Sequence, residues 1–177
     1  MKTVVYPGSF NPFHAGHLDV VEQALKVFDK VVILVADNPN KKYSVKIVER
    51  MSIIKEMFKD VYDEKYVKID GTIGTVIGYC VQNNIDMIIK GIRNGNDLDA
   101  EIEQKYFNSE LAPNIQTVYF TPSLVNKTIS STLIRGLKGF NSKFIDNALE
   151  VAYKNTPSVY ATNKLEVYKK IKDLYLY

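Results

Sequence analysis

Residues 4–17 read V-V-Y-P-G-S-F-N-P-F-H-A-G-H, and the fold of the chain is decided in this stretch. The first three residues are β-branched or aromatic, as is typical of a strand. The glycines behind them let backbone amides approach a phosphate closely, and the first turn of a following helix adds positive potential. The stretch therefore predicts a strand, a loop and a helix that together bind phosphate.

Both histidines of the chain, His14 and His17, lie in this stretch. Imidazoles on one turn at a helix start can donate hydrogen bonds to a nucleotide phosphate, and the Ser9 hydroxyl can supply another. A single histidine near a helix start is more often structural. The strand, the glycines and the two histidines occur in one order and need a common explanation, and nucleotide binding provides it.

Short apolar runs follow along the chain and alternate with segments of helical period. Each run is β-branched or aromatic and suits a strand: residues 31–35, 66–69, 87–89 and 117–120. Between them, spacings of three and four place apolar side chains on one helix face, as at Leu18, Val21, Leu25 and Phe28. The alternation predicts an α/β fold with a Rossmann-like, doubly wound parallel sheet. Ligands bind such sheets beyond the carboxyl ends of the strands.

Length and composition are those of one globular domain. The chain has 177 residues, of which 46% are hydrophobic and 24% are charged, and about two thirds of the unfolded surface can be buried at this length. We expect a single domain over residues 1–177, with a core at about 1–137 and a helical C-terminal part at about 138–177. An apolar stripe on a final helix, packed against the body or a neighbouring subunit, is expected from Leu165, Tyr168, Ile171 and Tyr175.

Composition excludes several classes of protein. Cys80 is the single cysteine and no Cys/His ligand spacing occurs, so neither a disulfide framework nor a zinc module can form. The net charge of +3 comes without a dense block of Lys or Arg, which disfavours nucleic acid as a partner. The N-terminal apolar run is too short for a signal peptide, and no stretch approaches the ~18 apolar residues of a membrane span. We therefore expect a cytoplasmic protein without a membrane partner.

A second candidate cluster, from Thr128 to Arg135, follows the last strand run. Small hydroxyl residues ahead of an apolar helical run are typical of a helix N-cap, and taken alone they favour that interpretation. After a strand of the same sheet, the backbone amides of such a turn can also receive the β and γ phosphates of a nucleotide. Ser130, Ser131 and Thr132 are therefore candidate nucleotide-binding residues.

Two further loops carry basic residues at the ends of strand runs. Lys90 and Arg93 flank Gly91 directly after the fourth run. Basic residues around a glycine suit a phosphate ligand, although a plain turn with solvated charges explains them equally well. The loop at residues 38–42 follows the second run and supplies Lys41 as another cation for the same edge of the sheet.

The stretches at residues 8–17 and 129–135 together resemble the paired signatures of the adenylyltransferase and cytidylyltransferase superfamily. Within that superfamily the chain resembles the phosphopantetheine adenylyltransferase family. The matching positions are residues 6–10, residues 38–42, residues 91–93 with Asp97 and Glu101, and Asn108 with residues 111–113. These matches keep their order and spacing from about residue 3 to about residue 135, which is most of the chain.

The resemblance implies a reaction in which ATP and 4′-phosphopantetheine give dephospho-coenzyme A and pyrophosphate, a step of coenzyme A synthesis, without a covalent protein intermediate. It also implies that Mg2+ accompanies the nucleotide and takes no dedicated metal ligands from the protein. Members of the family are typically hexamers, so the resemblance implies a homo-oligomer.

The resemblance further implies roles for individual residues. In the catalytic set, His17 donates to the α-phosphate, while Ser9 and Lys41 orient the acceptor phosphate. The nucleotide-binding set comprises Gly8, Ser9, Phe10, His14, His17, Gly91, Arg93, Glu101, Ser130, Ser131 and Thr132. The acceptor-binding set comprises Ser9, Lys41, Val76, Lys90 and Asn108.

Alternative functions stay open on the sequence. A nicotinate or nicotinamide mononucleotide adenylyltransferase shares both signatures, although the block at residues 90–101 argues against it. A cytidylyltransferase fits less well. A nucleotide-binding module that has lost its chemistry belongs to a different class. Retention of His14, His17, Lys41 and Arg93 argues against such a module. Three departures from the family pattern keep it open: a lysine in place of the usual arginine at Lys90, a missing aromatic residue at 125–128, and a glycine-rich segment at 71–78.

Overall fold

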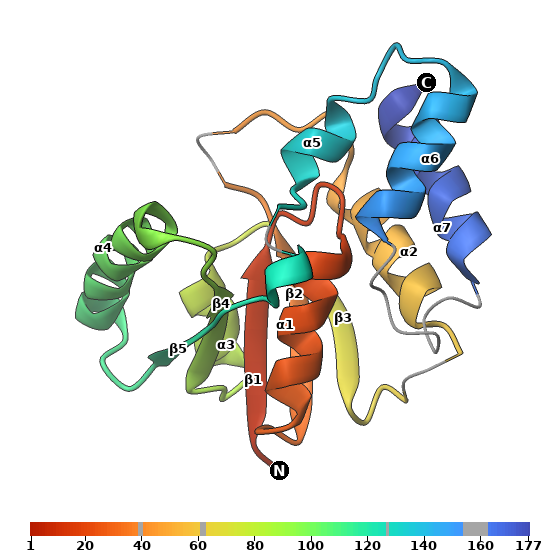
Figure 1. Ribbon diagram of the computed structural model, residues 1–177. Helices are drawn as coiled ribbons and strands as arrows, with labels where there is room; N and C mark the ends of the chain where they lie inside the picture. Colours follow the sequence, from red (N-terminus) through yellow and green to blue (C-terminus); the bar gives the residue numbers. More distant parts are fainter. Residues whose placement is uncertain (39–40, 61–62, 127, 154–162) are drawn as a thin grey trace.

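In the part of the chain that the structure describes, five parallel strands form one sheet at the centre of the molecule (Figure 1). The structure is a computed structural model and describes residues 1–38, 41–60, 63–126, 128–153 and 163–177. The strand order is β3-β2-β1-β4-β5, and each neighbouring pair is parallel. The strands are β1 (Thr3–Gly8), β2 (Lys30–Ala36), β3 (Val67–Thr72), β4 (Met87–Gly91) and β5 (Gln116–Phe120). All the expected strand runs lie in this sheet, except that Tyr66 precedes β3.

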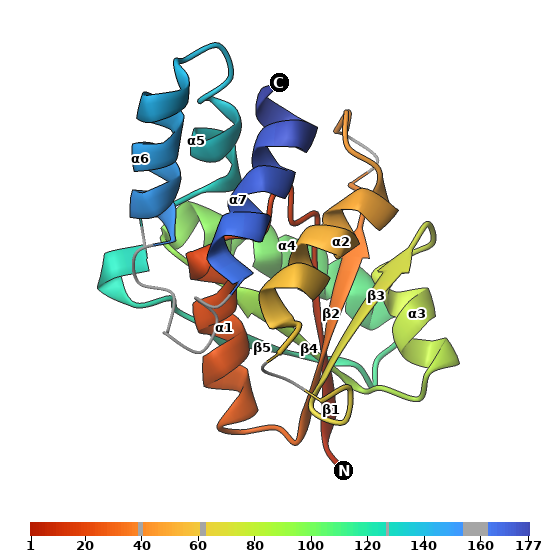
Figure 2. The ribbon, with the colours of Figure 1, turned by 90° about the vertical axis from the view of Figure 1, so that its right-hand side faces the viewer.

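The central strands β1 and β2 are buried on both faces, and their successive side chains enter two separate cores. Val4 and Tyr6 belong to the larger core, whereas Val5 between them belongs to the smaller one. This follows from the two-residue period of a strand. Helices therefore cover both faces, with α3 on one side and α1 and α2 on the other (Figure 2). The doubly wound α/β fold predicted from the sequence is confirmed.

Helices connect and cover the strands. Those that follow strands of the sheet are α1 (Ala15–Leu25), α2 (Ile47–Phe58), α3 (Val76–Gln82) and α4 (Gly95–Leu111). After β5 come the 3-10 helix η1 (Leu124–Asn126), α5 (Ser131–Arg135), α6 (Ser142–Ala152), α7 (Lys164–Ile171) and the π-helix η3 (Lys172–Leu176).

The path of the chain reverses between β1 and β4. The chain leaves β1 toward β2 and β3, and it then crosses back to add β4 and β5 on the other side of β1. Val5 of β1 is in register with Ile88 of β4, so both strands end at the same edge of the sheet. Loops that leave such a point in opposite directions form the usual ligand site of a doubly wound sheet. The loop after β1 and the loop after β4 are therefore adjacent.

The C-terminal helices α6 and α7 pack onto the larger core. Ile145 of α6 and Ile171 of α7 are fully buried, and α7 contacts α2. The expected apolar stripe is confirmed for Tyr168, Ile171 and Tyr175 and is wrong for Leu165, which is 81% exposed. The buried face of α7 is centred near Val167, Tyr168 and Ile171, and at 3.6 residues per turn Leu165 lies about 100° away from that centre.

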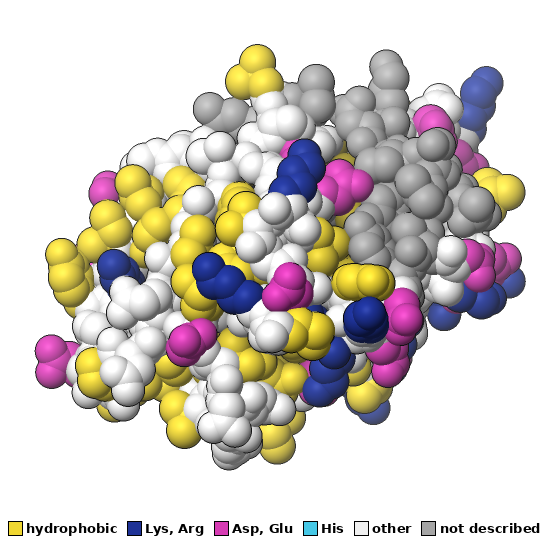
Figure 3. Space-filling model, turned by 90° about the horizontal axis from the view of Figure 1, so that it is seen from below, with side chains coloured by type: hydrophobic (Ala, Val, Ile, Leu, Met, Phe, Trp, Pro, Cys, Tyr) yellow, Lys and Arg dark blue, Asp and Glu magenta, His cyan; other side chains and the backbone are white. Residues whose placement is uncertain are grey.

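Helix α4 differs from the other long helices because it has no buried residue. Tyr106, Phe107 and Leu111 are each more than 60% exposed along it. The view from below shows apolar side chains gathered on the side of the molecule where α4 lies in Figure 1, and neither histidine is visible from that end (Figure 3). Among the described residues, no helix has the length and apolar character needed to span a bilayer.

Candidate active site

The two histidines close the first turn of α1 with their own side chains. His14 is the N-cap residue, and its Nδ1 accepts a hydrogen bond of 3.1 Å from the Gly16 N–H. The Nδ1 of His17 accepts a hydrogen bond of 3.2 Å from the His14 N–H. An imidazole that accepts at Nδ1 carries its proton on Nε2. Both rings therefore keep an Nε2–H donor that is not used in the cap.

Both imidazoles are neutral near pH 7. Burial, with a further contribution from the positive charge of Arg93, lowers the pKa of His14 to about 3. Burial also lowers the pKa of His17 well below its usual value, and the neighbouring His14 and Arg93 lower it further. The two ring centroids are 3.8 Å apart, which makes a second positive charge there unfavourable. His17 is thus suited to donate a hydrogen bond from its neutral ring and not to carry a positive charge.

Aromatic rings enclose the imidazole of His17. The centroids of Phe10 and Phe13 lie 5.1 and 5.2 Å from it, and that of Tyr6 lies at 6.4 Å. Phe10 has a φ of +44°, a left-handed conformation that is unusual for a bulky residue. Its ring passes so close to Gly8 that a Cβ there would lie 2.8 Å from it. The glycine is thus needed for the close approach of Phe10, which fixes one side of the His17 ring.

Arg50 of α2 holds the first residue of the loop between β1 and α1, which we call the β1–α1 loop (residues 9–14). Its guanidinium is fully buried, and its Nη1 donates to the Ser9 carbonyl oxygen at 2.7 Å. The remaining donors bind the Val45 carbonyl oxygen at 3.1 Å and the Asp37 carboxylate. The guanidinium carbon also lies 4.6 Å from the centroid of the Tyr43 ring. A charge so deeply buried is stable because each of its three nitrogens donates a hydrogen bond, one of them to a carboxylate.

Three more carbonyl groups of the β1–α1 loop are bound by side chains from distant parts of the chain. Arg135 donates to the Asn11 carbonyl oxygen. The Ser131 hydroxyl donates to the Pro12 carbonyl oxygen at 2.8 Å, and the Tyr153 hydroxyl donates to the Phe13 carbonyl oxygen at 2.5 Å. The structure thereby fixes peptide orientations throughout a loop whose residues 10–14 are buried.

The predicted Ser130–Thr132 cluster begins helix α5, directly against the β1–α1 loop. Ser130 is the N-cap, and its hydroxyl oxygen accepts from the Leu133 N–H at 3.2 Å, as the capping interpretation predicts. Ser131 binds the loop carbonyl, and the Thr132 hydroxyl accepts from Arg135 at 3.2 Å. The structure therefore brings this cluster and the histidine loop together, although they are more than a hundred residues apart in sequence.

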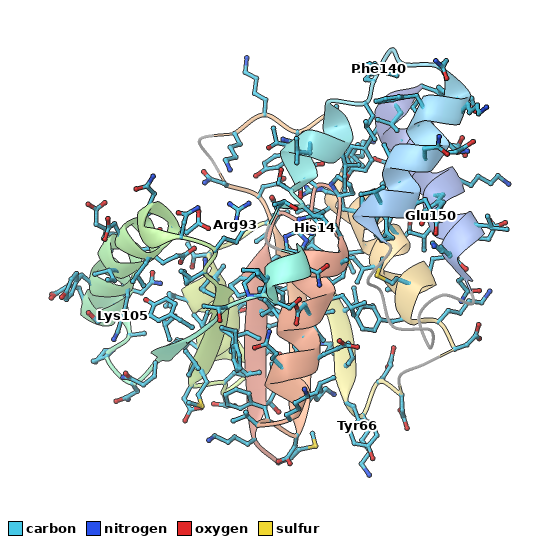
Figure 4. The ribbon with its side chains drawn as sticks, viewed as in Figure 1. His14, Tyr66, Arg93, Lys105, Phe140 and Glu150 are labelled. Atoms are coloured by element: carbon cyan, nitrogen blue, oxygen red, sulfur yellow. The ribbon has the colours of Figure 1, made fainter. Side chains whose placement is uncertain are left out.

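Arg93 lies at the other side of the histidines, in the loop after β4 (Figure 4). Its Nε donates to the Asp97 carboxylate at 2.9 Å, and its backbone N–H donates to the same group at 3.2 Å. Asn94 is the N-cap of α4 and accepts from the Asp97 N–H at 3.0 Å. The side chain of Arg93 is 41% exposed, so the guanidinium stays open to a ligand on the solvent side.

Lys90 and Glu101, which were assigned to different ligands, form an ion pair with an Nζ to Oε1 distance of 3.0 Å. Both side chains are about one quarter exposed. Burial raises the pKa of Tyr6, and the charge of Glu101 raises it further, so this pair lies near the Tyr6 hydroxyl. At Gly91, a Cβ would come within 3.1 Å of Val20 and 3.5 Å of the Tyr6 hydroxyl oxygen. Gly91 therefore permits β4 to approach α1 closely.

The remaining predicted site residues lie farther from the histidines or in partly described segments. Lys41 is exposed, but residues 39–40 of its loop lie outside the described residues. Val76 begins α3, just beyond the carboxyl end of β3. Asn108 accepts from Gln104 at 3.1 Å within α4, and one turn before it Lys105 is far from His14 in Figure 4. The single chain thus does not bring Asn108 next to the histidines. Of the altered segment at 125–128, Lys127 is not described.

Sequence reasoning missed Arg50 and Tyr153 and gave no role to Arg135. A signal existed for Arg50, since it is a charged residue within the apolar face of α2 that includes Ile53, Ile54 and Met57. The sequence motif contained Arg135 but did not reveal its partner. No local pattern identifies Tyr153, because its partner Phe13 lies 140 residues earlier in the chain.

A metal ion at this site would have to be held largely by the phosphates of a bound nucleotide. In the described ranges, no group of three or more His, Cys, Asp or Glu side chains is arranged to hold one. Three carboxylates that follow strands at this edge of the sheet, Asp37, Asp97 and Glu101, each pair with a cation. Mg2+ often binds through substrate phosphates with only one or two carboxylates. These donors fit an ion that arrives with a nucleotide and do not fit an all-protein metal cage.

Comparison with known families shows that the site lies in the part of the chain whose sequence is similar to that of known relatives. The cytidylyltransferase-like family matches residues 5–137. A phosphopantetheine adenylyltransferase of Francisella tularensis subsp. novicida (strain U112) is 38% identical over 147 residues, which cover 82% of this chain and 88% of the relative. The match region contains the β1–α1 loop, the loop after β4 and α5, whereas Tyr153 lies after the family match ends.

Solved structures agree with the fold. A Vibrio parahaemolyticus protein assigned as a nicotinate-nucleotide adenylyltransferase superposes with a TM-score of 0.57 at 19% identity, covering 96% of each chain. A bifunctional NMN adenylyltransferase/ADP ribose pyrophosphatase of Francisella tularensis gives a TM-score of 0.53 at 19% identity, covering 96% of this chain and 51% of that protein. At these identities the similarity concerns the fold alone.

We predict that acid destabilises the fold through the two histidines. Their pKa values are lowered in the folded state and return to about 6.5 on unfolding, so the unfolded chain binds protons that the folded chain does not. The contribution of the histidines to the free energy of unfolding should be fully present above pH 6.5 and should be lost as the pH falls below 6.5. The share of His14 is on the order of 2 kcal/mol between pH 6.5 and pH 5.

Urea unfolding of the wild type and His14→Asn at both pH values measures this share. Asparagine is a good N-cap residue and does not titrate, so the difference between the two proteins cancels the contribution of the carboxylates. Equal losses of stability in both proteins would show that His14 is not the buried neutral group.

Proposed function

The chain belongs to the phosphopantetheine adenylyltransferase family and is a nucleotidyltransferase, and we propose that it transfers the adenylyl group of ATP to 4′-phosphopantetheine. An oxygen of the acceptor phosphate attacks the α-phosphorus of ATP. The bond between the α-phosphorus and the oxygen that bridges to the β-phosphate breaks, and pyrophosphate leaves. The products are dephospho-coenzyme A and pyrophosphate, and no bond to the protein forms.

The observation that carries this proposal is a neutral His17 with its proton on Nε2. It lies at the point where the chain leaves β1 and β4 in opposite directions. A neutral N–H donor can bind the α-phosphate more strongly as charge develops on it, without any proton transfer. The aromatic rings around His17 hold the donor in one orientation. Phosphoryl transfer gains mainly from such positioning and from fixed donors.

The leaving pyrophosphate is assigned to the two clusters on either side of the histidines. Arg93, with the turn at Ser130–Thr132, would bind the β and γ phosphates. The partly exposed guanidinium of Arg93 supports this assignment. The remaining members of the proposed nucleotide set are Gly8, Ser9, Phe10, His14, Gly91 and Glu101. Mg2+ would neutralise phosphate charge as part of the bound nucleotide.

The acceptor is assigned to the same edge of the sheet, with residues on both sides of β1. Lys41 and Ser9 would orient its phosphate, and Val76 and Lys90 would line the path of its arm. Lys90 pairs with Glu101, so binding of an acceptor at Lys90 requires that this ion pair be shared or broken. Asn108 completes the proposed set.

A homo-oligomer is part of the proposal, with the hexamer of the family as its expected form. Support comes from α4, whose apolar residues Tyr106, Phe107 and Leu111 are exposed in the single chain. Aromatic side chains of this kind are enriched at protein interfaces. Sedimentation of the full chain measures the subunit number. The cytoplasmic location stays a prediction.

An acceptor panel tests the function directly. The wild-type protein with ATP and Mg2+ is offered 4′-phosphopantetheine, nicotinate mononucleotide or nicotinamide mononucleotide, and pyrophosphate and adenylylated products are measured by mass spectrometry. We expect dephospho-coenzyme A to be the main product. Product from a pyridine mononucleotide alone would contradict the acceptor assignment and leave nucleotidyl transfer intact. Binding of ATP without pyrophosphate release for every acceptor would instead identify a binding module.

We predict that His17→Ala lowers kcat by about 10²–10³-fold and changes ATP affinity far less, because the donor acts mainly in the transition state. Steady-state kinetics give kcat, and calorimetric titration of the variant gives the affinity for ATP. Circular dichroism checks that the variant folds. A folded His17→Ala protein with turnover near that of the wild type would remove His17 from the catalytic set.

We also predict that Lys41→Ala impairs catalysis with the acceptor more than binding of ATP, since its ammonium is a point charge on the acceptor phosphate. Lys42→Ala is the matched control, because Lys42 is the adjacent residue and is also exposed. The apparent KM for the acceptor and kcat are measured for both variants. Equal effects of the two substitutions would contradict a specific role of Lys41 and would show that it contributes only general positive charge.

A further inference from the structure

The peptide group that joins Phe13 to His14 is bound at both ends. On one side its carbonyl oxygen accepts the Tyr153 hydroxyl at 2.5 Å, and on the other side its N–H donates to Nδ1 of His17 at 3.2 Å. The carbonyl and the N–H of a trans peptide are rigidly coupled and point in opposite directions. A donor that fixes the carbonyl therefore also fixes the direction of the N–H group whose hydrogen bond His17 accepts.

Tyr153 is built to act as this donor. It lies directly after α6, its side chain is 2% exposed, and burial raises the pKa of its hydroxyl, which therefore keeps its proton. Its ring packs against Tyr168 of α7 with centroids 5.5 Å apart. The hydroxyl has no freedom to leave the Phe13 carbonyl without losing its hydrogen bond in a buried place, which is costly.

We propose that Tyr153 is a positioning residue for adenylyl transfer, which acts through the Phe13–His14 peptide to hold His17 in the Nε2–H tautomer and in a fixed orientation. This proposal rests on the proposed function for its catalytic part. The hydroxyl, the peptide and the imidazole form a chain in which each hydrogen bond polarises the next. Tyr153 thereby gives the region after the family match a direct influence on the reacting centre, and the described residues of that region contribute no other hydrogen bond to the β1–α1 loop.

The tautomer of His17 in the wild type is the first test, and it needs neither a variant nor a substrate. The chain contains only two histidines, so the 15N resonances of both rings can be assigned. We expect a neutral ring with the proton on Nε2 for His17. A proton on Nδ1 would overturn the proposal, whatever the outcome of the acceptor panel.

The substitution Tyr153→Phe removes the donor and keeps the ring. We expect a mixture of His17 tautomers and a loss of kcat on the order of tenfold, the factor associated with about one hydrogen bond, while the apparent KM for ATP changes less than about twofold. Tyr168→Phe is the matched control. It removes a hydroxyl from the same ring pair, but that hydroxyl binds the Glu150 carboxylate at 3.2 Å and does not reach the loop. The control should leave the tautomer and kcat unchanged.

A double-mutant cycle with His17→Ala separates positioning from general support of the fold. If Tyr153 acts through His17, Tyr153→Phe should lower kcat by less than about twofold in the His17→Ala protein, because the group that it positions is gone. Equal losses of kcat in both backgrounds, with an unchanged 15N spectrum in Tyr153→Phe, would show that Tyr153 is only a core residue. If the wild type transfers no adenylyl group, the proposed function fails, and the 15N spectra alone then decide whether the link to His17 exists.

Discussion

Four carbonyl groups of the β1–α1 loop, at Ser9, Asn11, Pro12 and Phe13, are each bound by a side chain from elsewhere in the chain. Loops normally lie at the surface, where water satisfies their backbone. Here residues 10–14 are buried, and an unpaired buried carbonyl costs about 1–3 kcal/mol. The loop can keep its shape only because α2, α5 and the residue after α6 supply the missing donors. The arrangement of these helices around the sheet is therefore tied to the conformation of one loop.

This constraint has a direct chemical effect. The donors fix the peptide groups of the loop, and His14 and His17 use backbone N–H groups to hold their own rings. Burial and the nearby charge of Arg93 keep both rings neutral. A neutral, oriented N–H in a place with little water interacts more strongly with an anionic ligand than the same group in solution. An anionic ligand would thus meet donors that are already oriented.

Much of the fold could be predicted from the sequence, because strand runs and helical periods are local patterns. The runs at residues 31–35 and 87–89 became β2 and β4, and the signatures at 8–17 and 129–135 were joined correctly at one edge of the sheet. Leu165 was misplaced because spacing gives a period and not the direction of the core. The pairing of Lys90 with Glu101 was also missed, because the sequence does not show which way a strand-end side chain turns.

The sequence by itself determined the alternating α/β elements, the histidine loop and the family, since each is written in contiguous residues or in a fixed order of motifs. Only the tertiary structure decided how the loop is held. The partners Arg50, Ser131, Arg135 and Tyr153 lie 41, 119, 124 and 140 residues from the carbonyls that they bind. A buried carbonyl requires a donor, but any donor that the fold brings near can serve. Which side chain meets which carbonyl is therefore fixed by the packing of helices on the sheet, and no local pattern records it.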